Sequence, residues 1–94
     1  VVKVIDLTDN AHVERELMLI KVRATGSARA EVKRSADIFR AQIVDVTSSL
    51  YTIQIVGDEA KLDGFIEVIG RDRILEVVRS GVIGILRGER TLSL

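Results

Sequence analysis

The feature that most constrains this chain is a strand-like alternation near its start. Within residues 14–24, Met18 and Ile20 fall on one face, and Leu17 and Leu19 fall on the other. Side chains alternate between the two faces of a strand. One face of this segment is therefore apolar from residue 18 to residue 24, and the other combines leucines with charged residues. An apolar strand face needs a cover. The sequence therefore predicts a strand that is buried on one side.

The spacing of the apolar residues then changes to that of a helix, and this change occurs twice. Thr25-Gly26-Ser27 offers a turn with Ser27 as a helix N-cap, and a helical stripe follows it. Two β-rich segments separated by a polar turn come next, and a second helical stripe begins after Asp58 and ends at Gly70. The expected strands are 14–24, 42–46, 50–56 and 74–78, and the helical stripes contain Ala28, Val32, Ala36 and Phe39, then Leu62, Phe65, Ile66 and Ile69.

This order of elements predicts an α+β fold, the ferredoxin-like βαββαβ sandwich. Right-handed crossovers place both helices on one face of a four-stranded antiparallel sheet. Residues 1–6, VVKVID, are also strand-like and are expected to form an extra N-terminal strand. The other face of the sheet is expected to be open.

The composition argues against several classes of function. The 94 residues include 14 basic and 14 acidic side chains, so the chain has no electrostatic footprint for nucleic acid or an anionic membrane. Bases could stack only on Phe39, Tyr51 or Phe65, two of which lie on expected helices. No apolar run approaches the roughly 20 residues that span a bilayer. The absence of cysteine excludes a thiolate metal site and fits a cytoplasmic protein. We therefore expect a cytoplasmic protein that binds neither nucleic acid nor membrane.

One group of acidic residues and a histidine has the residue types of a metal or acid–base site: Asp6, Asp9, His12, Glu14 and Glu16. Metal ligands must converge on one point, whereas the last three are spread along one strand face. Acid–base catalysis would also need a pocket that shifts a pKa, and no such pocket is indicated. We interpret the group as a solvated strand entrance, and we expect no metal, no cofactor and no catalytic residue.

Gly81, Gly84 and Gly88 form the run GVIGILRG, which shares only its glycines with a phosphate-binding loop. The run lacks the Lys-Ser/Thr pair of a P-loop, the glycine spacing of a dinucleotide fold and a following helix. We interpret it as a terminal strand kinked by glycine.

Five longer runs carry a resemblance: KVIDLT at 3–8, HVERELMLIKV at 12–22, EVKRSADIFRAQIVDV at 31–46, YTIQIVGDEAKLDGFIEVI at 51–69 and ILEVVRSGVIGILRG at 74–88. Together they resemble the C-terminal half of the small, regulatory subunit of acetohydroxyacid synthase, also called acetolactate synthase. The resemblance implies a domain without chemistry of its own. It implies a catalytic large subunit as partner, which uses thiamine diphosphate and which the small subunit activates and makes sensitive to valine. Self-association is also expected.

The resemblance further implies a domain organisation. In the family, an N-terminal ACT domain holds valine at its dimer interface and precedes a C-terminal domain of similar element order. Residues 1–10 then correspond to the last strand and linker of an ACT domain, 11–88 to the ferredoxin-like regulatory domain, and 89–94 to a tail. The effector-site motif of the family has no counterpart in this sequence, so no valine-binding residue is assigned.

The open face of the sheet is the candidate site. Leu17, Leu19 and Ile43 are expected to emerge there among polar side chains, and such a face is a contact surface more often than a ligand site. We therefore predict a non-catalytic regulatory domain that acts by protein–protein contact. One alternative is a free-standing, ACT-like sensor of amino acids, which would need a polar, glycine-lined pocket at a dimer interface. The other is an enzyme, for which the sequence shows no constellation of residues.

Overall fold

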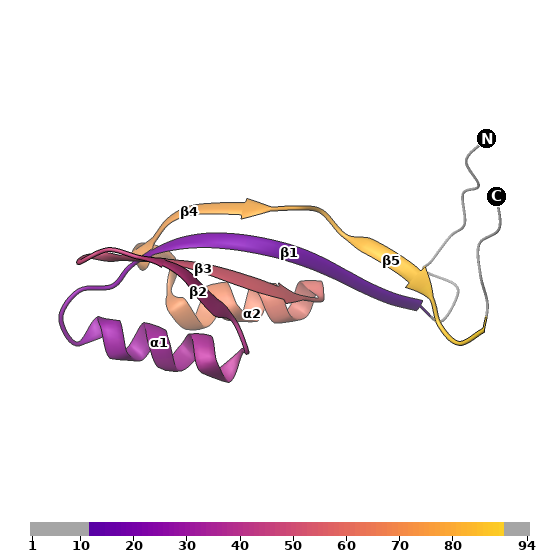
Figure 1. The fold of residues 1–94 in the computed structure, drawn as a ribbon, viewed down its shortest axis with the longest axis horizontal. Coiled ribbons are helices and arrows are strands. Elements are labelled where there is room, and N and C mark those ends of the chain that lie inside the picture. Colours follow the sequence, from indigo (N-terminus) through magenta and orange to yellow (C-terminus); the bar gives the residue numbers. More distant parts are fainter. Residues whose placement is uncertain (1–11, 90–94) are drawn as a thin grey trace.

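The computed structural model describes residues 12–89, and their elements follow the predicted order (Figure 1). The extra strand expected at residues 1–6 lies outside the described residues. The elements are β1 (His12–Arg23), α1 (Ala28–Ile38), β2 (Gln42–Val46), β3 (Leu50–Gly57), α2 (Glu59–Ile69), the 3-10 turn η2 (Arg71–Arg73), β4 (Ile74–Arg79) and β5 (Ile83–Leu86). The βαββαβ prediction is confirmed, and β5 adds a strand to it.

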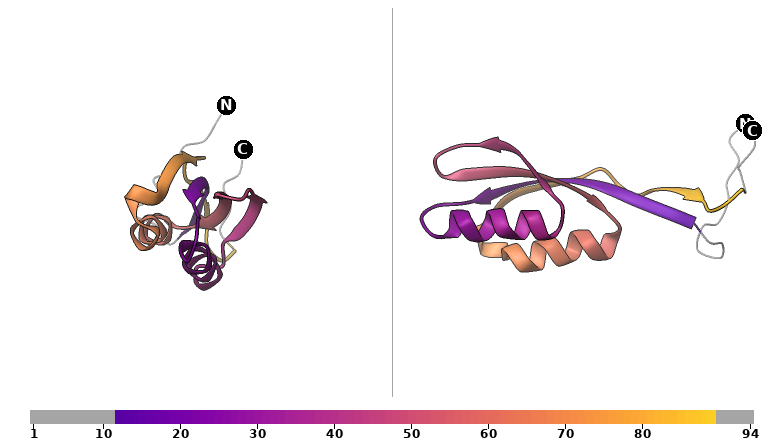
Figure 2. Two further views of the ribbon diagram at one scale, coloured as in Figure 1. Left: turned by 90° about the vertical axis from the view of Figure 1, so that its left-hand side faces the viewer. Right: turned by 60° about the horizontal axis from the view of Figure 1, so that its bottom comes forward.

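The sheet has the order β2-β3-β1-β4, and every pair is antiparallel. Strand β1 therefore lies in the middle, between β3 and β4. Both helices lie on the same side of the sheet (Figure 2). This arrangement follows from two right-handed crossovers, each of which carries its helix across the same face. The opposite face has no helix over it within the described part of the chain.

The hydrophobic core lies between the helices and the covered face of the sheet. Met18, Ile20 and Val22 of β1 are fully buried, as predicted from their alternation. They pack in one cluster with two residues of β3 and with the buried stripes of both helices. The β3 residues are Ile53 and Ile55, and the helical residues include Val32, Leu62, Phe65 and Ile69. The ring of Phe39, at the end of α1, meets the ring of Phe65 edge to face, with 5.3 Å between the ring centroids. The predicted helical stripes are therefore the faces that the fold buries.

The two helix starts differ in how they are capped. Asp58 caps α2 as predicted, because its carboxylate Oδ1 accepts a hydrogen bond from the backbone N–H of Lys61 at 2.9 Å. Ser27 precedes α1, but its backbone is already helical and its side chain makes no capping bond. Ser27 thus occupies the predicted N-cap position, but its side chain does not cap the helix. At the other end of α2, Gly70 has φ of 94°, a conformation that favours glycine.

Strand β1 is longer than the sheet that it organises, and its first four residues leave the body as a two-stranded ribbon (Figure 1). His12–Arg15 pair with β5, whereas Met18–Val22 pair with β4. Two successive strands therefore pair with one edge of β1. Between them, the backbone N–H of Ser80 donates to the carbonyl oxygen of Leu17 at 2.9 Å. The hydroxyl of Ser80 in turn accepts from the backbone N–H of Leu17 at 3.0 Å. These two hydrogen bonds continue the pairing with β1 through the segment between β4 and β5.

Glycines shape this terminal segment as predicted. Gly84 lies within β5, and Gly81 and Gly88 flank the strand with φ of 87° and 73°. Both angles lie in the region that favours glycine, so these residues let the chain bend before and after β5. The interpretation as a terminal strand kinked by glycine is confirmed.

The two faces of β1 give a direct test of the fold. Ile20→Asp places an unpaired charge in the core and should lower the free energy of unfolding by about 4 kcal/mol or more. Lys21→Asp changes the adjacent residue on the other face and should cost about 1 kcal/mol or less. Chemical denaturation of the two variants beside the parent chain measures both values. Equal losses would contradict the register of β1.

Candidate interaction surface

The uncovered face of the sheet, called the open face below, carries exposed aliphatic side chains at its centre. Leu17 and Leu19 of β1 are 38% and 40% exposed. Leu17 lies opposite Val56 of β3, and Leu19 lies opposite Val78 of β4, so the four side chains share this face. The predicted positions of Leu17 and Leu19 are therefore confirmed. That they contact another protein stays a prediction.

The same face continues onto the ribbon. Val13 and Arg15 have the same parity as Leu17 on β1, and they lie opposite Ile85 and Ile83 of β5. Ile83 and Ile85 are 75% and 70% exposed, among the highest values for large aliphatic residues in the described chain. Together with Val13, Arg15 and Gly84 they line a shallow hollow of about 300 Å³. The sequence pattern of GVIGILRG gave no indication that its isoleucines extend the face of a distant strand.

Polar side chains occupy the far end of the open face. Lys21 lies opposite Glu76, and the Lys21 Nζ is 3.8 Å from the Glu76 carboxylate Oε1. Thr52 and Asp45 lie beside this pair, and the group borders a second hollow of about 250 Å³. An exposed ion pair of this kind contributes little stability, but it neutralises both charges locally. The open face is thus aliphatic at the centre and ribbon, and polar at one end.

Ile43 does not belong to the open face, and this part of the prediction is wrong. Ile43 lies opposite the buried Ile53 and packs against the core. A register shift follows between Ile43 and Asp45, which places Asp45 opposite Thr52. Alternation alone cannot assign a short strand to a face, because a shift of one residue exchanges its faces.

The sequence interpretation of the acidic strand entrance is wrong at Glu16. This residue is only 7% exposed, because it shares the parity of Met18 on the covered face. Its Oε1 accepts hydrogen bonds from Nε and Nη2 of Arg79 at 3.1 and 2.6 Å. Its Oε2 accepts from the backbone N–H of Gly81 at 3.1 Å, and Nη1 of Arg79 reaches Asp63 of α2 at 2.9 Å. One carboxylate thus joins β1 to the junction of β4 and β5, and the arginine joins both to α2.

These contacts shift the titration of both partners. Hydrogen bonds from Arg79 lower the pKa of Glu16, against the opposing effect of burial. The bonds to Glu16 and Asp63 raise the pKa of Arg79, so its guanidinium stays charged. The signal in the sequence was the parity of Glu16 with Met18, because a carboxylate on a buried face requires a partner. Its partner, Arg79, lies 63 residues further along the chain, so no local sequence pattern predicts the pair.

The members of this acidic group that the structure describes do not converge on one point. Nε2 of His12 and Oε2 of Glu14 are 3.0 Å apart at the tip of the ribbon, while Glu16 faces Arg79. Asp6 and Asp9 lie outside the described residues. Within residues 12–89, no three His, Cys, Asp or Glu side chains form a group that could hold a metal ion.

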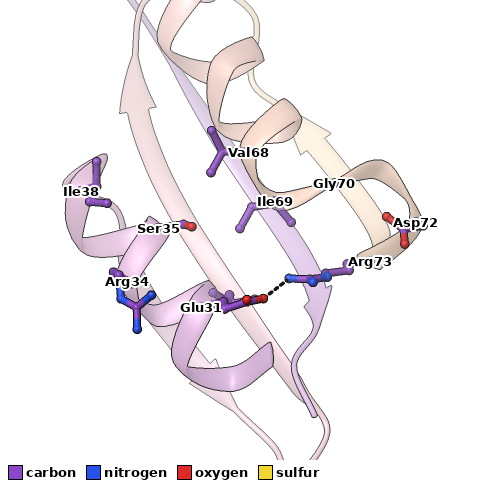
Figure 3. Close-up of a pocket in the computed structure, with 10 residues that line it drawn as sticks. Glu31, Arg34, Ser35, Ile38, Val68, Ile69, Gly70, Asp72 and Arg73 are labelled. Atoms are coloured by element: carbon purple, nitrogen blue, oxygen red, sulfur yellow. Dashed lines mark ion pairs between the residues drawn. The ribbon is translucent and has the colours of Figure 1, made fainter. Parts of the chain in front are cut away.

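A separate groove of about 450 Å³ lies between α1 and the end of α2 (Figure 3). Val32 and Ile69 are its buried residues, and an ion pair of 3.2 Å between Glu31 and Arg73 crosses it. This pair ties α1 to the turn before β4, although an exposed ion pair adds little to stability. None of the site residues expected from the sequence lines this groove.

The fold and the open face define an α+β domain of ferredoxin-like topology with helices on one side of its sheet. None of the helices described in residues 12–89 has the length and apolar character to cross a membrane. Residues 15–88 match the family described as the small subunit of acetolactate synthase. The chain belongs to this family.

Relatives from distant organisms support the assignment. The chain is 53% identical to the acetolactate synthase isozyme 3 small subunit of Escherichia coli, over 98% of the chain and 57% of the relative. It is 41% identical to a probable acetolactate synthase small subunit of Methanothermobacter thermautotrophicus, over 98% of the chain and 55% of the relative. The crystal structure of the Thermotoga maritima small subunit aligns with a TM-score of 0.80 and 33% identity, over 89% of this chain and 51% of that one. The chain thus spans little more than half the length of these relatives.

The Glu16–Arg79 contact predicts a pH-dependent contribution to stability. Because the pKa of Glu16 is lowered in the folded chain from a usual value of 4.5, its contribution is present above pH 4.5 and is lost as the pH falls through the folded pKa. Glu16→Gln should therefore be less stable than the parent at pH 7, and the difference should shrink in acid. Denaturation curves between pH 3 and pH 7 measure it, from about 1.5 units below to about 2.5 units above the usual pKa.

A matched control is available on the surface of α2. Glu67→Gln removes an exposed carboxylate that lies 3.2 Å from Arg71, and it should change stability by less than about 0.5 kcal/mol at pH 7. A loss at Glu16→Gln that is no larger than this, or that does not change with pH, would contradict the assigned role of Glu16.

Proposed function

We propose that this chain is the C-terminal regulatory domain of an acetolactate synthase small subunit and acts by protein–protein contact. In this proposal residues 11–88 form the domain, residues 1–10 are the end of an ACT domain and its linker, and residues 89–94 are a tail. Family membership over residues 15–88 is the observation that carries the proposal. A domain of this kind binds no thiamine diphosphate and has no synthase activity of its own.

The partner in this proposal is the catalytic subunit of the same enzyme, which uses thiamine diphosphate in the cytoplasm. The small subunit raises the activity of that partner and conveys feedback inhibition by valine in branched-chain amino acid synthesis. The open face supports a role in contact, because exposed Leu17, Leu19, Ile83 and Ile85 gather on one side of the molecule. Scattered aliphatic residues would carry no such implication.

The division of labour within the small subunit follows from linkage. An effector changes the activity of a partner only through different affinities for two states of the assembly. A domain without the effector site therefore cannot transmit the valine signal alone, although it can take part in the states between which valine selects. The upstream ACT domain must supply the binding site.

This division predicts the behaviour of two proteins. The 94-residue chain alone should not bind valine and should not confer valine inhibition on the catalytic subunit. The same chain joined to an upstream ACT domain should raise the activity of the catalytic subunit and make it sensitive to valine. Calorimetry with valine and assays of the catalytic subunit with each protein measure both halves.

Two outcomes would change the proposal. Saturable binding of valine by the 94-residue chain alone would favour the alternative of an amino acid sensor. Failure of the joined protein to alter the catalytic subunit, although it folds and binds valine, would contradict the regulatory role.

A further inference from the structure

The ribbon, formed by His12–Arg15 and β5, meets the body at a joint that comprises Glu16 and Leu17 of β1 and residues 79–81 (Figure 1). Within the described part of the chain, no residue of the ribbon belongs to the core cluster, so the core does not fix the direction of the ribbon. Strand β3 does not follow the ribbon, because its pairing with β1 ends at Glu16 and Gly57. The direction of the ribbon therefore depends on the contacts at the joint.

The segment between β4 and β5 has the character of a hinge. Ser80 and Gly81 are both exposed, and the Ser80 hydroxyl supplies the acceptor for the backbone N–H of Leu17 at this point of the sheet. Gly81 has φ of 87°, and a Cβ placed on it would meet no non-neighbouring atom within 4 Å. The glycine therefore serves the backbone conformation and not close packing. A few residues between elements, free to change their backbone angles, are typical of hinges.

A network of side chains crosses this hinge. One carboxylate oxygen of Glu16 accepts from two nitrogens of Arg79, and the other accepts from the backbone N–H of Gly81. Arg79 is the last residue of β4, so the carboxylate holds the body on one oxygen and the start of the ribbon on the other. The third nitrogen of Arg79 donates to Asp63 and ties the network to α2. Hydrogen bonds between charged groups are stronger than neutral ones, so the network favours one position of the ribbon.

We propose that Ser80 and Gly81 form a hinge, and that the network of Glu16, Arg79 and Asp63 holds this hinge in one position and couples the angle of the ribbon to α2. Its regulatory role rests on the proposed function, in which residues 1–10 connect an upstream ACT domain to the first residue of β1. A change of state upstream then reaches the body through the ribbon. An effector acts by favouring one of two states, and two angles of the ribbon give those states a structural difference.

Distances within the 94-residue chain test the hinge. The chain has no cysteine, so two introduced thiols carry spin labels only at the chosen positions. Ile85→Cys labels the ribbon and Val68→Cys labels α2, and both parent residues are exposed. Pulsed electron spin resonance, in an excess of unlabelled chain, then measures distances within one chain. The labelled parent should give one narrow distribution of distances.

Two substitutions in the network should shift or widen this distribution. Arg79→Lys keeps a cation beside the buried Glu16 but loses the planar fork that bonds two carboxylates at once. Asp63→Ala removes only the bond to α2. The same changes in the exposed pair of Arg71 and Glu67, Arg71→Lys and Glu67→Ala, are the matched controls and should leave the distribution as in the parent. Thermal melts of each variant show that it is folded.

Valine inhibition tests the regulatory role of the hinge. In the chain joined to an upstream ACT domain, Asp63→Ala should raise the valine concentration for half-inhibition of the catalytic subunit at least about fivefold, the lower end of typical coupling between sites. Activation without valine should stay within about twofold of the parent, as should valine binding to the small subunit alone, because Asp63 lies away from the open face and the effector site. Glu67→Ala should change none of these quantities.

The outcomes separate the hinge from the proposed function. A broad distribution in the labelled parent would overturn the hinge, as would equal distributions in the network variants and their controls. A changed distribution with unaltered valine inhibition would overturn the regulatory role of the hinge. Failure of the joined parent protein to alter the catalytic subunit would instead contradict the proposed function, and the distances would still decide whether the hinge exists.

Discussion

Burial of one face of β1 beneath two helices is the interaction on which the rest of this structure depends. Met18, Ile20 and Val22 supply the centre of the core, and the strand that carries them pairs with β3, β4 and β5. Because side chains alternate along a strand, covering these residues places Leu17 and Leu19 on the opposite side. The open face is thus a geometric consequence of the core, and the odd-numbered residues of β1 share it with their partners on β3, β4 and β5.

The Glu16–Arg79 contact shows how the body and the ribbon are held together. Glu16 is the point at which the buried face of β1 changes from aliphatic to polar, and it lies where β4 gives way to β5. Its hydrogen bonds to Arg79 and Gly81 fix the junction, and Arg79 extends the network to Asp63 on α2. A buried carboxylate with fewer partners would destabilise this region, whereas here each of its oxygens accepts a hydrogen bond.

A covered face for stability and an open face for contact suit a domain whose proposed task is regulation. The family assignment identifies the chain as part of an acetolactate synthase small subunit, and the chain spans little more than half the length of such relatives. A small ligand affects a distant catalytic site through contact surfaces that differ between two states of the assembly. In the proposed function, the exposed aliphatic side chains of the open face offer such a surface.

The sequence by itself determined the order of the elements, the buried face of β1, the helical stripes and the cap at Asp58. These follow from local periodicity and local hydrogen bonding, which a short stretch of residues carries within itself. Only the tertiary structure decided that Ile43 faces the core, that Glu16 is buried against Arg79, and that Ile83 and Ile85 extend the face of β1. Strand register and ion-pair partners join residues that are far apart in the chain, so they depend on how the whole sheet packs.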